Sequence, residues 1–201
     1  KGNYNVSRLA YLLRLFPDVR FIVPFRDPVG HVASLMQQHA HFSEWGTRDP
    51  RITKHMSRSG HFEFGRDRRP INFGNGAATE RVQNLWANDF EARGWAAYWT
   101  DVYSHLVSLL EHNPKQAQQT LIVDYDRLCK EPEAGLRDIF HWCELDIDVS
   151  YLRDVSSRIK GPRPLDPDLS KTERADIVAE TAGTLDRLRA LTGGCSDSQR
   201  R

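Results

Sequence analysis

The sequence predicts an α/β fold in which helices flank a parallel β-sheet, and three observations support this prediction. Two short apolar runs, 20–25 and 120–125, contain the β-branched residues typical of buried parallel strands. Segments with apolar residues at every third or fourth position precede and follow both runs, as in amphipathic helices. Helices that alternate with strands in this way indicate parallel strands joined by helical crossovers.

The N-terminal part of the chain predicts a helix, a strand and a second helix. Apolar residues at helical spacing cover 6–16, and the apolar run 20–25 follows. Asp27 and Pro28 are residue types favoured at the N-cap and first position of a helix, so we expect the second helix to begin there. Its apolar residues share one face. Three polar residues share the opposite face: His31, Ser34 and Gln38.

Residues 40–80 show no sustained periodicity and are rich in Arg, Gly, His and aromatic residues. We interpret this segment as a long insert or lid, because irregular segments of this length are uncommon in compact domains unless they serve a function. The expected organisation is therefore a single domain over 1–194 that carries the insert, followed by a flexible tail, 195–201.

The C-terminal half repeats the alternation of helix and strand. Apolar and aromatic residues at helical spacing cover 79–111, and we expect Gly94 to break that helix. The second strand run, 120–125, follows, and Pro132 is expected near the start of the next helix. The sequence Ser-Lys-Thr-Glu at 170–173 is a capping box that opens a last helix.

Composition argues against several function classes. The 28 basic and 27 acidic residues nearly balance, which argues against nucleic acid as a partner. No apolar stretch approaches the roughly 20 residues that cross a bilayer. The three cysteines are too few and too scattered for a disulfide framework, which favours a reducing compartment and a cytoplasmic location.

A phosphate site is predicted at the end of the first strand. In open α/β sheets, ligands bind beyond the carboxyl ends of the strands, where Arg26 lies. The following helix begins close by, and its free N–H groups favour an anion. Ser34, two turns into that helix, can add a hydroxyl donor to the guanidinium. The alternatives are a surface salt bridge for Arg26, with Asp27 adjacent, and a solvated hydroxyl for Ser34.

The block FPDVRFIVPFRDPVGHVASL, 16–35, resembles the 3′-phosphate-binding segment of sulfotransferases that use PAPS (3′-phosphoadenosine 5′-phosphosulfate). In that family an arginine ends a strand and a serine follows eight residues later in the next helix, and Arg26 and Ser34 match this pair. The resemblance implies a P-loop-NTPase-like sheet, PAPS as cofactor with PAP as its product, and no metal requirement. It also implies a small-molecule, lipid or carbohydrate acceptor.

Two later blocks resemble the same family. LIVDYDRLCKEPEAGLRDIFHWCELD, 121–146, is similar to the family's strand, turn and following helix, which implies that Tyr125 lies near the adenine. Without the resemblance, Tyr125 is an ordinary tyrosine at a strand end. The block SSRIKG is similar to a C-terminal loop in which Arg-Lys-Gly reaches the 3′-phosphate. Three residues carry this likeness: Arg158, Lys160 and Gly161. An extra isoleucine follows the arginine here, so the resemblance leaves open which side chain makes the contact, and a solvated basic loop is the alternative.

Two features of the family are missing from the sequence. No glycine-rich loop for the 5′-phosphosulfate occurs, so we expect a sheet that is incomplete at its N-terminus, in a C-terminal portion that is inactive alone. Lys1, 25 residues before Arg26, fits the lysine of a Lys-x-His sequence found in one branch, but Asn3 replaces the histidine base. The base then comes from a preceding portion or from another residue of this chain. His61 in the insert is our candidate, because an ordinary histidine titrates near neutral pH. The alternatives are an exposed terminal lysine and a solvated histidine.

Other functions stay open at this point. Loss of the base would leave a non-catalytic nucleotide-binding or interaction module on the same fold. A P-loop-like small-molecule kinase would use a similar phosphate clamp but would require magnesium. His39 and His41 offer two ligands to a metal, but no zinc-type motif accompanies them.

Overall fold

The structure is a computed structural model that describes residues 3–161 and 169–193. The chain divides into two compact units, each formed by three segments of the sequence. The first unit contains 1–7, 28–105 and 166–184, and the second contains 8–27, 106–165 and 185–201. The single domain over 1–194 stays a prediction, and the predicted tail, 195–201, lies outside the described residues.

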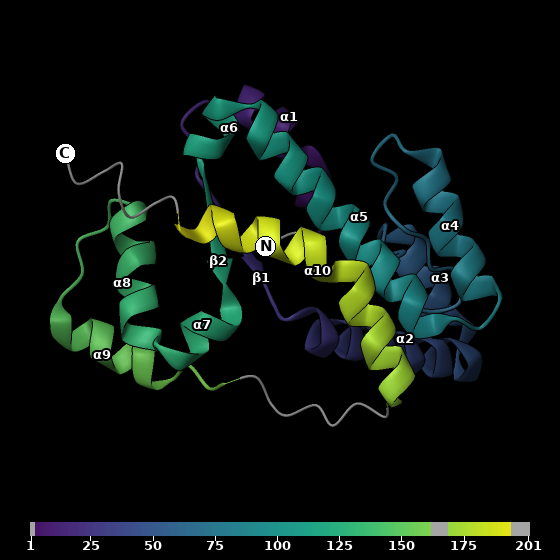
Figure 1. Cartoon of the computed structure of the whole chain (residues 1–201). Coiled ribbons are helices and arrows are strands. Elements are labelled where there is room, and N and C mark those ends of the chain that lie inside the picture. Colours follow the sequence, from purple (N-terminus) through teal and green to yellow (C-terminus); the bar gives the residue numbers. More distant parts are fainter. Residues whose placement is uncertain (1–2, 162–168, 194–201) are drawn as a thin grey trace. The chain divides into compact units, whose positions relative to one another are not determined.

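Helices dominate both units (Figure 1). The first unit holds the 3-10 helix η1 (Asn3–Arg8), α2 (Pro28–Arg48), α3 (Pro50–Arg58), α4 (Gly76–Ala87) and the first parts of α5 (Glu91–His112) and α10 (Lys171–Gly193). The second unit holds α1 (Leu9–Leu15), β1 (Phe21–Phe25), α6 (Pro114–Gln118), β2 (Thr120–Asp124), α7 (Tyr125–Lys130), α8 (Pro132–Trp142) and α9 (Val149–Ser157). The boundary between the units falls within α5 and within α10.

The second unit is built on the parallel pair β1 and β2, which lie side by side in Figure 1. Phe21 pairs with Thr120 and Phe25 pairs with Asp124, so both strands end at the same edge of the sheet. Helix α7 begins directly after β2 and contacts both β2 and α8, and α8 contacts α9. This small parallel sheet with flanking helices is compatible with the predicted α/β class, although the described residues are mostly helical.

The first strand was predicted to be a buried parallel strand, but it is only partly buried. Its side chains alternate in exposure, since Phe25 is 1% exposed whereas Ile22 is 43% exposed. Successive side chains of a strand point to opposite faces, so one face of this pair is less covered than the other. The apolar composition therefore predicted the strand correctly but not its burial.

The segment expected to be irregular, 40–80, is helical over much of its length. Helix α2 continues almost to Asp49, whose carboxylate accepts a hydrogen bond from the Arg51 N–H at 3.0 Å and caps α3. Pro50 is the first residue of α3, so this Asp-Pro pair repeats the signal that predicted the start of α2. Irregular backbone is confined to 59–75 within this segment.

The long helix predicted over 79–111 is two helices, and the break lies at 88–90 rather than at Gly94. Gly94 is buried inside α5, where it faces the indole ring of Trp86 from α4. An added Cβ at Gly94 would lie 2.3 Å from Trp86 Cδ1. The glycine therefore permits the close approach of α4 and α5 and does not end a helix.

Three predicted helix starts are confirmed, and the first is that of α2 at Pro28. Helix α8 begins at Pro132. Before α10, the Ser170 N–H donates to the Glu173 carboxylate at 2.8 Å, and the Glu173 N–H donates to the Ser170 hydroxyl at 3.2 Å. These reciprocal hydrogen bonds are those of a capping box.

The core of the first unit joins α2, α4, α5 and α10. Its buried residues are Val32, Val82, Trp86, Ala92, Trp95, Ala96, Ala97 and Ile177. Arg68 stacks on Trp86, with Cζ 4.2 Å from the ring centroid, and its guanidinium forms an ion pair with Glu91, Nη2 to Oε2, at 2.7 Å. Glu91 also accepts a hydrogen bond from Trp95 Nε1 at 2.8 Å. The paired and stacked arginine thus fastens segment 59–75 to the core.

His39 on α2 lies at the edge of this core. The Gly65 N–H donates to His39 Nδ1 at 3.2 Å, so the neutral imidazole carries its hydrogen on Nε2, which lies 3.4 Å from the Ser43 hydroxyl. Burial, and then the Arg68 cation, lower the pKa of His39 below its ordinary value, and Glu91 opposes this shift. The folded protein therefore favours the neutral form of His39.

We expect Gly94→Ala to lower the free energy of unfolding by about 1–3 kcal/mol, because the new methyl group meets the buried indole of Trp86. Gly183→Ala in α10 is the matched control. Its added Cβ meets nothing within 4 Å, so it should raise stability by about 0.5–1 kcal/mol through helix propensity. Urea unfolding followed by circular dichroism measures both changes, and equal stability of the two variants would contradict the close approach.

Stability should fall as the pH is lowered through the range in which histidine titrates. Because folding lowers the pKa of His39, the unfolded chain takes up this proton first, and acidification favours unfolding. Urea unfolding at about pH 7.5 and about pH 5.5 should show a smaller loss for His39→Gln than for the wild type. His55→Gln, at an exposed position of α3, should retain the wild-type loss. An unchanged loss in His39→Gln would show that other groups cause the pH dependence.

Candidate functional site

Arg26 and Tyr125 follow the two strands at their carboxyl ends, and the structure brings them together. Because Phe25 and Asp124 are paired in the sheet, the residues directly after them leave the same edge. Arg26 Cζ lies 5.5 Å from the centroid of the Tyr125 ring, within the range of a cation–π contact. Both residues are half-buried. Two residues that the sequence placed at strand ends therefore form one site in the second unit.

The guanidinium of Arg26 has unsatisfied hydrogen-bonding capacity. Its Nε is buried and makes no hydrogen bond with any described residue. Buried N–H groups are nearly always paired in folded proteins, and a guanidinium N–H is among the strongest donors. An anionic ligand at this edge of the sheet would satisfy the group, whereas the alternative of a salt bridge within the chain finds no partner for Nε in the described residues.

Three aspartates shape the backbone of this site. The Asp124 carboxylate caps α7 by accepting hydrogen bonds from the N–H groups of Asp126 at 3.0 Å and of Arg127 at 3.1 Å. The Asp126 carboxylate in turn accepts the N–H of Asp27 at 2.6 Å. The residue that follows Arg26 is thus tied to the first turn of α7, and the cap fixes where Tyr125 leaves the strand.

Lys160 approaches α7 through its backbone. The Cys129 thiol, one turn after Tyr125, donates to the Lys160 carbonyl with an Sγ–O distance of 3.7 Å. The side-chain hydrogen bond with Cys129, and then burial, raise the pKa of Tyr125. Arg158, in contrast, is exposed and forms an ion pair with Asp154 at 2.5 Å. Gly161 is exposed at the end of the described loop.

Two other predicted residues are not joined to this site by the structure. Ser34 is half-buried in the second turn of α2 and belongs to the first unit, whereas Arg26 belongs to the second. The Arg26–Ser34 phosphate clamp therefore stays a prediction. Lys1 lies outside the described residues.

His61 lies in the irregular segment of the first unit and has a partner that the sequence analysis missed. Its Nδ1 is 2.9 Å from Glu63 Oε1. The other oxygen of Glu63 accepts a short hydrogen bond from the Tyr4 hydroxyl, which also accepts the Phe62 N–H at 2.9 Å. The His-x-Glu spacing was visible in the sequence, but the contact with Tyr4 joins residues 59 positions apart and had no local signal.

Further titratable residues line one face of α5. The Tyr98 hydroxyl accepts the Ile71 N–H at 3.3 Å, and burial raises the pKa of Tyr98 to about 12. Burial also raises the pKa of Asp101 and lowers that of His105, and His105 stacks on Phe73 with ring centroids 4.3 Å apart. Groups with shifted pKa values occur at functional sites more often than elsewhere. The face of α5 beside the irregular segment is therefore a candidate part of a functional site.

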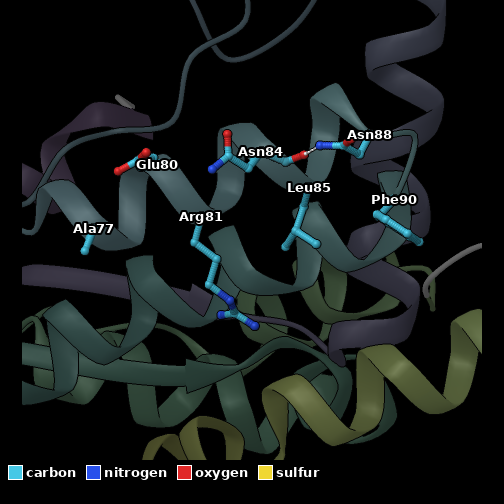
Figure 2. Close-up of a pocket in the computed structure, with 7 residues that line it drawn as sticks. All are labelled: Ala77, Glu80, Arg81, Asn84, Leu85, Asn88 and Phe90. Atoms are coloured by element: carbon cyan, nitrogen blue, oxygen red, sulfur yellow. Dashed lines mark hydrogen bonds between the residues drawn. The ribbon is translucent and has the colours of Figure 1, made fainter.

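A separate surface pocket of about 470 Å³ lies over α4 and the turn that follows it (Figure 2). It is lined by Ala77, Glu80, Arg81, Asn84, Leu85, Asn88 and Phe90. Both terminal nitrogens of Arg81 are bound to Glu180 at 2.7 Å, and the Asn88 side chain is bound to the Asn84 carbonyl at 2.8 Å. The pocket contains none of the residues that the sequence predicted for cofactor or catalysis.

The described residues include neither a metal-binding cluster nor a membrane-spanning helix. They contain no group of three or more His, Cys, Asp and Glu side chains placed to hold a metal ion. Over the same residues, no helix has both the length and the apolar character needed to cross a membrane.

The chain matches a protein family model. The family model described as Sulfotransferase domain matches residues 10–160, more than half of the chain. This match confirms the family resemblance inferred from the motifs at 16–35 and 121–146, both of which lie inside it. Comparisons with curated proteins and with solved structures gave no significant match.

We expect the N-cap of α7 to contribute measurably to stability. Asp124→Ala removes the acceptor of two backbone N–H groups and should lower the free energy of unfolding by about 0.5–2 kcal/mol. Asp124→Asn keeps a side-chain oxygen at the same position and should retain most of the wild-type stability. Urea unfolding compares the three proteins. An Asp124→Ala variant as stable as the wild type would show that this cap does not hold the start of α7.

Proposed function

Because the chain belongs to the sulfotransferase domain family, we propose that it moves a sulfuryl group from PAPS to a hydroxyl or amine of an acceptor. The proposed acceptor is a small molecule, a lipid or a carbohydrate, and the proposed location is the cytoplasm. The proposal includes a P-loop-NTPase-like parallel sheet, of which β1 and β2 are two strands, in a single domain.

The observation that carries the proposal is the buried Nε of Arg26, which lacks a hydrogen-bond acceptor among the described residues. Three arginines that stack on aromatic rings allow a comparison. Arg68 over Trp86 and Arg20 over Trp142 each bind a carboxylate, whereas the described residues give the buried Nε of Arg26 no hydrogen bond. A phosphate dianion would supply the missing acceptor in the bidentate geometry that a guanidinium prefers. The 3′-phosphate of PAPS is the dianion that the family resemblance suggests.

The remaining cofactor contacts are also part of the proposal. Tyr125, beside Arg26, would contact the adenine, and Ser34 would add a hydroxyl to the phosphate. In the C-terminal loop we assign the phosphate contact to Lys160 and Gly161 rather than to Arg158. The support is that the Arg158 guanidinium is engaged by Asp154, whereas the Lys160 backbone contacts α7 through Cys129.

Sulfuryl transfer requires three functions of the protein. PAPS supplies an activated sulfuryl group when it is bound, and transfer passes through a loose transition state that spreads negative charge over oxygens. The chain must orient the acceptor, neutralise that charge and accept the acceptor's proton. We assign charge neutralisation to Lys1 and proton acceptance to His61.

A non-catalytic nucleotide-binding module is the second candidate. The observation that favours it is Asn3, which cannot accept a proton at neutral pH and stands where one branch of the family has a histidine. Transfer of labelled sulfate from PAPS to a panel of acceptors, measured with the intact gene product, separates the two candidates.

Removal of the Arg26 side chain should weaken PAP binding at least about a hundredfold, because a buried dianion loses its main cationic partner. Isothermal titration calorimetry with the intact gene product measures the effect. Arg127→Ala is the matched control, since Arg127 lies two residues after Tyr125 in α7 with its side chain 68% exposed, and its loss should leave the PAP affinity within about twofold. Equal PAP affinity of Arg26→Ala and the wild type would refute the assignment.

A further inference from the structure

We propose that Glu63, locked by Tyr4, is a positioning residue that presents Nε2 of His61 to the acceptor as the proton-accepting atom. This inference rests on the proposed sulfuryl transfer. It concerns residues of the first unit only. It assigns roles to Glu63 and Tyr4, which lie 59 positions apart in the sequence.

The contact with Glu63 decides which nitrogen of His61 is the base. A carboxylate can only accept a hydrogen bond, so at 2.9 Å the His61 Nδ1 must carry the hydrogen. In the neutral imidazole the lone pair is then on Nε2. None of the described residues forms a hydrogen bond with Nε2, and the His61 side chain is 55% exposed. An acceptor hydroxyl can therefore reach the basic nitrogen.

Tyr4 holds Glu63 in place for this task. The Tyr4 hydroxyl donates to Glu63 Oε2 and accepts the Phe62 N–H at 2.9 Å, so it contacts both the side chain and the backbone of the segment. Burial, and then the Glu63 hydrogen bond, raise the pKa of Tyr4 to about 12, which keeps the phenol a donor. Burial alone would raise the pKa of Glu63, but hydrogen bonds from Tyr4 and His61 hold it below its ordinary value. The glutamate is thus an anion at neutral pH.

Other titratable groups near the triad of Tyr4, Glu63 and His61 do not compete with Glu63 for the His61 imidazole. Tyr98 on α5 interacts electrostatically with Tyr4 and Glu63 and stays protonated, because burial raises its pKa to about 12. Arg69 stacks on Phe62, with Cζ 4.7 Å from the ring centroid. Glu63 is therefore the anion bound to the imidazole, on the side opposite Nε2.

The position of the triad fits a base. Tyr4 is the neighbour of Asn3 in the chain, and Asn3 offers no ionisable group. In the proposed step the acceptor O–H or N–H gives its proton to Nε2 while its oxygen or nitrogen forms a bond to sulfur. The bond from sulfur to the phosphate oxygen of the donor breaks, and its electron pair leaves with that oxygen. The imidazolium formed on His61 is stabilised by the Glu63 carboxylate.

The experiment that tests this positioning of His61 combines spectroscopy with kinetics on the intact gene product. Long-range ¹⁵N–¹H spectra at about pH 8 should show His61 as the Nδ1–H tautomer, and Glu63→Gln should convert it to a mixture or to the Nε2–H form. His61→Ala should lower kcat by about 10²–10⁴-fold with unchanged PAP affinity, and added imidazole should restore part of the rate. His55→Ala, in α3, is the matched control and should keep the wild-type rate.

The Glu63 and Tyr4 variants test positioning as distinct from folding. Glu63→Gln should lower kcat/KM about 10–100-fold, because the His61 Nδ1–H loses the carboxylate that fixes its tautomer. Tyr4→Phe should have a smaller effect in the same direction. An Nε2–H tautomer in the wild type, or wild-type transfer by His61→Ala, would overturn the inference and leave the proposed function standing. Absence of PAP binding and of transfer in the wild type would instead overturn the proposed function and the base role with it.

Discussion

The parallel pairing of β1 and β2 is the constraint on which the candidate nucleotide site depends. Parallel strands of equal register end at one edge, so the residues after Phe25 and Asp124 leave the sheet together. This places Arg26 beside Tyr125 and allows the Asp126 carboxylate to accept the Asp27 N–H. An antiparallel pair would send the two strand ends to opposite edges, and neither contact would form.

A comparison of Arg26 with Arg68 separates a structural arginine from a ligand-binding one. Both guanidinium groups stack on an aromatic ring and are shielded from solvent. Arg68 binds Glu91, which also accepts the Trp95 N–H, so its donors serve the core. Arg26 shows the same stacking without a partner for Nε among the described residues. The two arginines differ in whether their N–H groups have hydrogen-bond acceptors, because stacking alone does not satisfy N–H groups.

Local signals predicted much of the fold. The Asp-Pro and Ser-Lys-Thr-Glu sequences mark helix starts because caps depend on a few adjacent residues, and the apolar runs mark both strands for a similar reason. The break predicted at Gly94 was wrong because a glycine that ends a helix and a glycine that lets two helices touch look the same in a sequence. Only the contact with Trp86 distinguishes them.

The candidate site was predictable to the extent that it follows from the ends of strands. Arg26 could be named in advance because it directly follows a strand, whereas Tyr125 was named from the family resemblance. Tyr4 and Glu63 could not, since long-range folding brings them together. Tyr98, Asp101 and His105 share the spacing of a helix face, but the tryptophan-rich apolar stripe of α5 obscured this polar face in the sequence pattern.

The fastening of segment 59–75 by Arg68 has a consequence for the divergence of such proteins. One guanidinium, held by an indole ring and a carboxylate, attaches the irregular segment to the helices, while most residues before it are half-buried or exposed. Substitutions at the exposed positions Arg66 and Asp67 can therefore alter the polarity of this surface without disturbing the helical scaffold, whereas Phe64 packs against the core. The surface of the segment can thus vary at these positions while the contacts of Arg68 with Trp86 and Glu91 stay the same.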